Sequence, residues 1–119
     1  MVKIMAVDDE SDISGLIKRV LEKDGHKVVV CSSGEEALEK YPNEKPDLVL
    51  LDVMMGGMDG WETCRNIRKL NKDQKILFLT ATTVTGSARE NMLKLNVRYL
   101  TKPFEPYELT ERVKVALEE

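Results

Sequence analysis

Five residues that could act together chemically stand directly after apolar runs in this sequence. Two carboxylates, Asp8 and Asp9, follow the first run, and Asp52 follows the third. A hydroxyl group, Thr80, follows the fourth run, and an ammonium group, Lys102, follows the fifth. If these runs are parallel strands, their carboxyl ends share one edge of a sheet, and the five side chains would converge there.

This combination of groups suits phosphoryl transfer onto the protein itself. Three carboxylates held close together repel one another and need a cation. Mg²⁺ prefers oxygen ligands and keeps several waters, which leaves coordination positions for a phosphoryl group. A carboxylate such as Asp52 can attack phosphorus, while Lys102 supplies positive charge and Thr80 a hydrogen bond. The glycines form neither a GxGxxG nor a Walker motif, so a nucleotide cradle is not indicated.

Each of these residues alone also has an ordinary structural interpretation. Asp8 and Asp9 could be a solvated pair at a helix start, and Asp52 could be a loop acid or a cap. Thr80 could satisfy backbone groups at a strand end, and Lys102 could be a surface lysine. Their joint placement after four different strands favours a site.

Strand-like and helix-like segments alternate five times along the chain. The predicted strands are Lys3–Val7, Lys27–Cys31, Asp47–Leu51, Lys75–Leu79 and Val97–Leu100. Their Val, Ile and Leu content is typical of strands buried on both faces of a parallel sheet. Amphipathic helical patterns lie between them. The alternation predicts one α/β domain over residues 1–119, a doubly wound parallel sheet with helices on both faces.

Capping patterns predict where several helices begin and end. Ser33 followed by Glu36 is typical of a capping box at the start of the second helix, which Pro42 is expected to end. Asp59 gives the third helix a similar start, and Pro106 stands near the start of the fifth.

Composition and charge exclude several classes of protein. The formal net charge is −3 and no basic stripe is present, so direct nucleic-acid binding by this domain is not expected. No apolar run reaches the roughly 20 residues that a membrane helix needs, and no signal peptide is evident. Cys31 and Cys64 lack the spacing of a metal site and are interpreted as reduced structural thiols. We expect a cytoplasmic protein without membrane association.

Four motifs resemble the signature of one known family. They are Val7-Asp8-Asp9-Glu10, Leu50-Leu51-Asp52-Val53-Met54-Met55 with Met58-Asp59-Gly60, Thr80-Ala81, and Lys102-Pro103-Phe104. Together they resemble the receiver domain of two-component response regulators, of the chemotaxis-regulator type. The resemblance covers essentially the whole chain. It implies a flavodoxin-like (βα)5 fold with strand order 2-1-3-4-5.

The resemblance also implies a role for each acidic residue. Asp52 would be the phosphoacceptor, taking its phosphoryl group from a sensor histidine kinase or a phosphotransfer protein. The implied cofactor is Mg²⁺, bound directly by Asp9, Asp52 and the backbone carbonyl of Met54. Asp8 would act mainly through a metal-bound water.

The remaining implied roles concern catalysis and switching. Lys102 would contact the phosphoryl group, and its peptide bond to Pro103 is expected to be cis. Thr80 would move toward the phosphate, and Tyr99 would repack behind it. The surface formed by the fourth helix, fifth strand and fifth helix would then change toward an output domain or partner protein.

Such a domain would be no enzyme toward other substrates, because it catalyses only its own phosphorylation and dephosphorylation. It would be a monomer or a phosphorylation-dependent dimer. Met54 and Thr82 would flank the path of the water that removes the phosphoryl group.

Gly56 departs from the family pattern, which usually has proline there. Glycine adds backbone freedom, so the loop that offers the Met54 carbonyl could be looser before a metal binds. Equal Mg²⁺ affinity in the wild type and in Gly56→Pro would contradict this hypothesis.

Two other functions remain open at this stage. A receiver-like domain could bind partners without phosphate, although the presence of all the core residues argues against it. A phosphatase acting on small molecules through an aspartyl phosphate usually needs a second acid two residues after the nucleophile, where this chain has Met54. Whether the domain stands alone or belongs to a longer regulator is not decided by the sequence.

Overall fold

The computed structural model describes residues 2–80 and 84–119, which form five strands alternating with five helices. The strands are β1 (Lys3–Val7), β2 (Lys27–Cys31), β3 (Leu48–Asp52), β4 (Lys75–Thr80) and β5 (Arg98–Thr101). The helices are α1 (Ser11–Lys23), α2 (Gly34–Glu44), α3 (Gly60–Leu70), α4 (Gly86–Leu95) and α5 (Pro106–Glu118).

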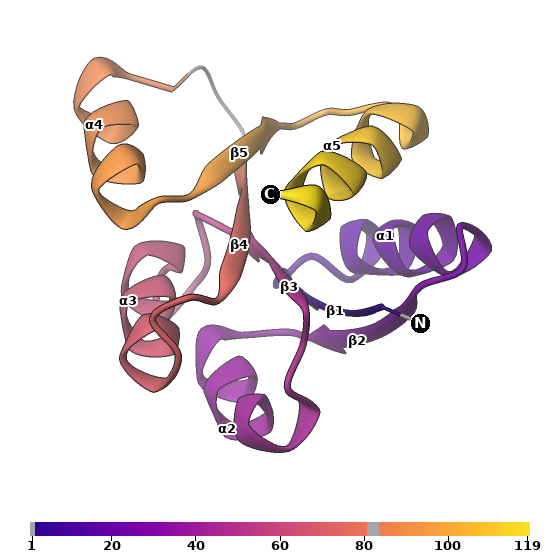
Figure 1. The fold of residues 1–119 in the computed structure, drawn as a ribbon, viewed down its shortest axis with the longest axis horizontal. Coiled ribbons are helices and arrows are strands. Elements are labelled where there is room, and N and C mark those ends of the chain that lie inside the picture. The colour runs from indigo at the N-terminus through magenta and orange to yellow at the C-terminus, as the bar shows by residue number, and fades with distance from the viewer. Residues whose placement is uncertain (1, 81–83) are drawn as a thin grey trace.

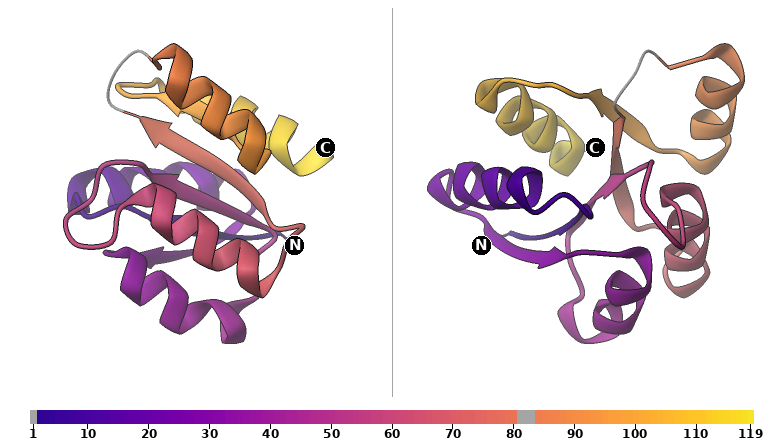
Figure 2. Two further views of the ribbon diagram at one scale, coloured as in Figure 1. Left: turned by 90° about the vertical axis from the view of Figure 1, so that its left-hand side faces the viewer. Right: turned by 180° about the vertical axis from the view of Figure 1, so that it is seen from behind.

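The strands form a single parallel sheet in the order β2-β1-β3-β4-β5. Helices α1 and α5 cover one face, and α2, α3 and α4 cover the other (Figures 1 and 2). A separate apolar cluster fills the space between the sheet and the helices on each face. The α/β fold and the strand order that the resemblance implied are both confirmed.

The two faces explain the apolar character of the central strands. Every residue of β3 is buried, because its side chains alternate between the two clusters. Leu48 and Leu50 pack with α1 and α5, whereas Val49 and Leu51 pack toward α2 and α3. A strand in this position cannot alternate apolar and polar residues, as an exposed sheet would allow.

The strand register determines which side chains meet at the carboxyl edge of the sheet. Val7 of β1 is paired with Leu51 of β3, so Asp8 and Asp52 both come one residue later, side by side. Thr80 of β4 is paired with Thr101 of β5, which places Lys102 just beyond that edge. The parallel pairing thus converts residues that are far apart in the sequence into neighbours.

Five strand boundaries differ from those predicted, each by one residue: β3 and β5 both begin and end one residue late, and β4 ends one residue late. β3 begins at Leu48 rather than Asp47, and β5 begins at Arg98 rather than Val97. The Asp47 carboxylate instead accepts a hydrogen bond from the Lys3 backbone N–H at 2.9 Å. β4 runs one residue further than predicted and includes Thr80.

The three helix starts that were predicted are confirmed, but one predicted helix end is wrong. The capping box expected at α2 is incomplete, because the Glu36 carboxylate accepts a hydrogen bond from the Ser32 N–H and not from the Ser33 N–H. The side chains of Ser33 and Asp59 accept hydrogen bonds from the backbone N–H groups three residues later, at 3.0 and 2.9 Å. Pro106 is the first residue of α5. Pro42, however, lies inside α2, which continues to Glu44. Proline in the last turn removes only one helical donor, and the turn still closes because the Lys45 N–H bonds the Tyr41 carbonyl at 3.0 Å.

Candidate functional site

Three of the predicted site residues meet at the carboxyl edge of the sheet. The Lys102 Nζ lies 2.8 Å from Asp8 Oδ2 and 3.6 Å from Asp52 Oδ2. Both aspartates are almost fully buried, with 1% and 3% of their surface exposed. Because buried carboxylates are costly without a counter-charge, the Lys102 ammonium group is what the structure provides to balance them.

Glu10, for which no role was predicted, also belongs to this group. Its Oε1 lies 3.7 Å from Lys102 Nζ, and its backbone N–H donates to Asp8 Oδ1 at 2.9 Å. Among the described residues, the carboxylates of Asp8, Glu10 and Asp52 offer oxygen atoms within 4.8 Å of one another. The only sequence signal for Glu10 is its place in the Val7-Asp8-Asp9-Glu10 motif.

This group of oxygens matches the chemistry of a hard divalent cation. Mg²⁺ takes oxygen ligands, is usually bound by one or two carboxylates, and retains water on its other positions. Two of the three carboxylates are buried and one is exposed, so the group is open to solvent on the side of Glu10. The donor set therefore fits Mg²⁺.

Burial raises the pKa of Asp52 to about 6, and the neighbouring charge of Asp8 adds to the increase. The positive charge of Lys102 and the hydrogen bond from the Met54 N–H, 3.2 Å from Asp52 Oδ1, act in the opposite direction. Near neutral pH most Asp52 side chains are ionised, so a nucleophilic carboxylate is available.

Burial disfavours the charge on Lys102, but its carboxylate partners more than compensate. The hydrogen bond to Asp8 and the charges of Asp8, Asp52 and Glu10 raise the pKa of Lys102 above its usual value. Lys102 is therefore a permanent cation in the ion-free protein. The Lys102–Pro103 peptide bond is cis, as the resemblance implied.

The N-terminal end of α3 packs directly against the backbone that carries Asp52. The Gly60 N–H donates to the Val53 carbonyl at 3.0 Å. A Cβ at residue 60 would collide with the Asp52 carbonyl oxygen and with the Val53 Cα atom. Only glycine allows this close approach, so Gly60 helps to fix the end of β3.

Asp9 and Met54, two predicted metal ligands, are placed differently from the buried pair. Asp9 is exposed, and its Oδ2 accepts a hydrogen bond from the Gly56 N–H at 3.2 Å. The Met54 side chain is exposed and its N–H is directed to Asp52. Direct ligation by Asp9 and by the Met54 carbonyl stays a prediction.

The two predicted switch residues lie on the neighbouring strands. Thr80 ends β4 and is buried, and its carbonyl accepts a hydrogen bond from the Lys102 N–H at 2.6 Å. Tyr99, in β5, is half-buried against the apolar cluster under α4. Their movement on phosphorylation stays a prediction. Ala81, part of the Thr80-Ala81 motif, and Thr82, predicted to flank the path of the water, lie outside the described residues.

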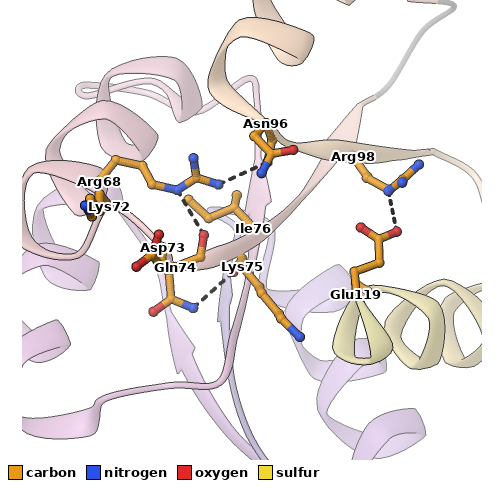
Figure 3. A pocket seen from close by; sticks show the side chains of 10 residues that line it. Arg68, Lys72, Asp73, Gln74, Lys75, Ile76, Asn96, Arg98 and Glu119 are labelled. Atoms are coloured by element: carbon orange, nitrogen blue, oxygen red, sulfur yellow. Dashed lines mark hydrogen bonds and ion pairs between the residues drawn. The ribbon is translucent and has the colours of Figure 1, made fainter.

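The other charged region of note lies at the opposite end of β4. A cavity of about 220 Å³ there is lined by side chains that include Arg68, Lys75, Arg98 and Glu119 (Figure 3). Most of its cations have partners: Arg98 pairs with Glu119, and Lys75 Nζ donates to the Leu117 carbonyl at 2.7 Å. This cavity contains none of the predicted site residues.

The two cysteines have the structural role that was predicted. Cys31 and Cys64 are both buried and free. Burial raises the pKa of both thiols, to about 11 for Cys31. Neither is therefore a reactive thiolate at neutral pH.

Comparison with known proteins agrees with this geometry. Residues 4–114 match the family model of the response regulator receiver domain. The chain therefore belongs to the response regulator receiver domain family of two-component systems.

Curated relatives from Bacillus subtilis (strain 168) include two transcriptional regulatory proteins. The chain is 43% identical over 118 residues to the alkaline phosphatase synthesis transcriptional regulatory protein PhoP, an alignment that covers 97% of this chain and 48% of that protein. It is 44% identical over 115 residues to the transcriptional regulatory protein YvrH, covering 96% and 48%. The chain thus spans about half the length of these relatives.

Solved structures of receiver domains have the same fold. The chemotaxis protein CheY4 of Vibrio cholerae superposes with a TM-score of 0.92 at 29% identity, covering 98% of both chains. The receiver domain of the Francisella response regulator 1452 gives a TM-score of 0.88 at 32% identity, covering 99% of this chain and 98% of the other. Among the described residues, no helix is long and apolar enough to cross a membrane.

Proposed function

We propose that this chain is a phosphorylation switch in which Asp52 accepts a phosphoryl group in an Mg²⁺-dependent reaction. The donor would be the phosphohistidine of a sensor kinase or of a phosphotransfer protein. The observation that carries the proposal is the contact of Lys102 Nζ with two buried carboxylates, Asp8 at 2.8 Å and Asp52 at 3.6 Å. Packing alone does not explain three buried or half-buried charges at the edge of an otherwise apolar sheet.

The transfer forms one bond and breaks another. An oxygen of ionised Asp52 bonds to phosphorus while the phosphorus–nitrogen bond of the donor breaks, and the leaving imidazole keeps the electron pair. Negative charge spreads over the phosphoryl oxygens during this exchange. Lys102 is close enough to Asp52 to neutralise part of it, and Thr80 stands at the adjacent strand end to donate a hydrogen bond.

Mg²⁺, when bound, would supply further positive charge at the phosphoryl oxygens. Asp8, Glu10 and Asp52 already present oxygens near one another, and Asp9 and the Met54 carbonyl would complete the ligand set. Without a divalent cation, a second negative group placed against Asp8 and Asp52 would face strong repulsion.

The proposal extends to what the switch controls. Thr80 and Tyr99 would transmit phosphorylation to the surface of α4, β5 and α5, which would engage an output domain or a partner protein. Relatives of about twice this length are named transcriptional regulators, so transcription is the output that we propose. The domain would act in the cytoplasm, as a monomer or a phosphorylation-dependent dimer, and would catalyse no reaction other than its own.

Beryllofluoride offers a test that does not depend on how long the phosphoryl group survives. This tetrahedral phosphoryl mimic would be added with Mg²⁺ to the ¹⁵N-labelled chain, and amide resonances would be followed by NMR. We expect saturable shifts in the residues around Asp52, at the end of β4, and in α4, β5 and α5.

The controls are two Asp→Asn substitutions, one at the proposed phosphoacceptor and one at a nearby aspartate outside the site. Asp52→Asn should show no response. Asp59→Asn removes a nearby acid outside the carboxylate group and keeps a side-chain oxygen for the N-cap, so it should respond as the wild type does. An equal response in Asp52→Asn, or none in the wild type, would contradict the proposed function.

A further inference from the structure

The Asp9 carboxylate is hydrogen-bonded to the loop after β3 and lies outside the group formed by the other acids. Its Oδ2 accepts a hydrogen bond at 3.2 Å from the backbone N–H of Gly56, a residue 47 positions away. Among the described residues, the acids close enough to share an ion are Asp8, Glu10 and Asp52. Asp9, although adjacent to both Asp8 and Glu10 in the sequence, is not one of them.

The contribution of Gly56 to this contact is its backbone N–H, and neither its conformation nor its surroundings require glycine. Its φ is not in the left-handed region, and a Cβ built on it would meet nothing within 4 Å. Gly57, the next residue, does have a positive φ of 70°. Alanine would therefore fit at residue 56 and keep the N–H donor, whereas proline would remove it.

Asp9 cannot use the same oxygen fully for the N–H and for an ion. Asp9 is not among the acids whose oxygens lie within 4.8 Å of one another, so its carboxylate would have to move to share an ion with them. That movement would stretch or break its hydrogen bond to the Gly56 N–H. Any divalent ion that draws Asp9 into its coordination must therefore work against the Gly56 N–H. Asp8 and Asp52 also accept backbone hydrogen bonds, but from residues two positions later in their own loops, at 2.9 and 3.2 Å. The bond of Asp9 instead joins two separate loops.

We propose that the Gly56 N–H holds the Asp9 carboxylate away from the acidic group in the ion-free protein and thereby lowers the affinity for Mg²⁺. Gly56 is then a positioning residue for metal binding, acting through Asp9. This inference rests on the proposed function, because it assumes that the acidic group binds Mg²⁺.

Gly56→Pro and Gly56→Ala separate this mechanism from simple loop stiffness. Both substitutions reduce backbone freedom, but only proline removes the N–H. Mg²⁺ binding would be measured by isothermal titration calorimetry on the full chain, with circular dichroism to verify the fold of each variant. We expect Gly56→Pro to bind Mg²⁺ roughly three- to tenfold more tightly, the factor for a hydrogen bond of ordinary net strength. Gly56→Ala should bind with the wild-type affinity.

A second readout needs no variant. In the wild type, hydrogen exchange at the Gly56 amide, followed by NMR, should be slow without Mg²⁺ and become several-fold faster at saturating Mg²⁺. Faster exchange would support release of the donor, and unchanged exchange would overturn it.

The possible outcomes separate failure of this positioning role from failure of the proposed function. If Mg²⁺ binds the wild type and Gly56→Pro equally well, or if Gly56→Ala tightens binding as much as Gly56→Pro does, the positioning role is wrong and the proposed function stands. If the wild type binds no Mg²⁺ at all, both are wrong.

Discussion

Asp52 carries its negative charge at a position that disfavours charge. It is almost completely buried, Asp8 lies beside it, and its pKa is raised to about 6 as a result. The proposed reaction nevertheless needs the ionised form, because only the carboxylate is nucleophilic. The site therefore keeps a group whose ionisation destabilises the ion-free fold, and Lys102 only partly compensates.

Asp52→Asn should stabilise the ion-free protein at neutral pH. The folded-state pKa of Asp52, about 6, lies above the ordinary value of 3.8, so the folded state binds more protons and stability falls as pH rises through that interval. Removing the charge should raise the free energy of unfolding at pH 7.5 by roughly 2–3 kcal/mol. The gain should shrink as pH falls from 6 toward 4. Urea unfolding in EDTA at several pH values measures both effects.

An exposed acid provides the matched control for this pH dependence. Asp73 lies on the surface between α3 and β4, so Asp73→Asn should change stability by less than about 0.5 kcal/mol at any pH in the range. A destabilised Asp52→Asn at pH 7.5 would mean that Asp52 is held ionised by favourable interactions, contrary to this interpretation.

At the scale of elements, Arg68 connects three segments at the edge of the sheet opposite to the site. Its guanidinium donates to the carbonyls of Gln74 at 2.9 Å and Asn96 at 3.1 Å, and also to the Leu95 carbonyl. Figure 3 shows it reaching from α3 toward the start of β4 and the end of α4. Arg68 thus satisfies the C-terminal carbonyls of α4, which have no intrahelical donors. The end of α4 remote from the site is therefore held by Arg68.

Arg68→Met should loosen α4 selectively. Methionine keeps much of the apolar stem but loses the three charged hydrogen bonds, so we expect stability to fall by roughly 2 kcal/mol. Hydrogen exchange by mass spectrometry should show faster exchange in residues 86–95 and no change in β1. Arg65→Met, an exposed arginine on the same helix, should leave both quantities unchanged. Equal exchange in α4 of the two variants would show that Arg68 does not anchor it.

In the molecule as a whole, the residues that stabilise the fold are separate from those that form the proposed site. Buried aliphatic side chains occupy both faces of the sheet, and almost all the buried charge is confined to the carboxyl edge. The free energy from burying this apolar core therefore offsets the repulsion among Asp8, Glu10 and Asp52, and the core packs without them. A cation bound at that edge should stabilise the entire domain, because it binds only the folded chain.

Mg²⁺ should raise the melting temperature of the wild type in a saturable way. At about 100 times the dissociation constant, linkage gives about 2.7 kcal/mol, or roughly 10 °C for a domain of this size. Differential scanning calorimetry in EDTA and in increasing Mg²⁺ measures the effect, with NaCl at matched ionic strength as the control. Asp52→Asn should respond much less. The same increase with NaCl would mean that general screening, rather than a site, is responsible.

Much of this architecture could be predicted from the sequence because it depends on local patterns. Apolar runs located every strand to within a residue, and their parallel pairing brings Asp8, Asp52 and Lys102 together as expected. The side-chain directions could not be predicted in this way. Asp9 is turned by an N–H donor 47 residues away, and no local pattern reports such a partner.

Two further features were not predicted, for different reasons. Pro42 was expected to end α2, because the rule for proline in a helix takes no account of its position in the last turn. No role was predicted for Glu10, because an exposed glutamate before a helix is common. Only the folded chain shows that it lies beside Lys102.

The most direct test of the central claim is the intact mass of the protein after incubation with acetyl phosphate and Mg²⁺, in samples quenched at short times. We expect a single phosphoryl adduct on the wild type that is absent with EDTA and absent in Asp52→Asn. An adduct that persists in Asp52→Asn, or that forms equally well without Mg²⁺, would contradict the assignment of Asp52 as a metal-assisted phosphoacceptor.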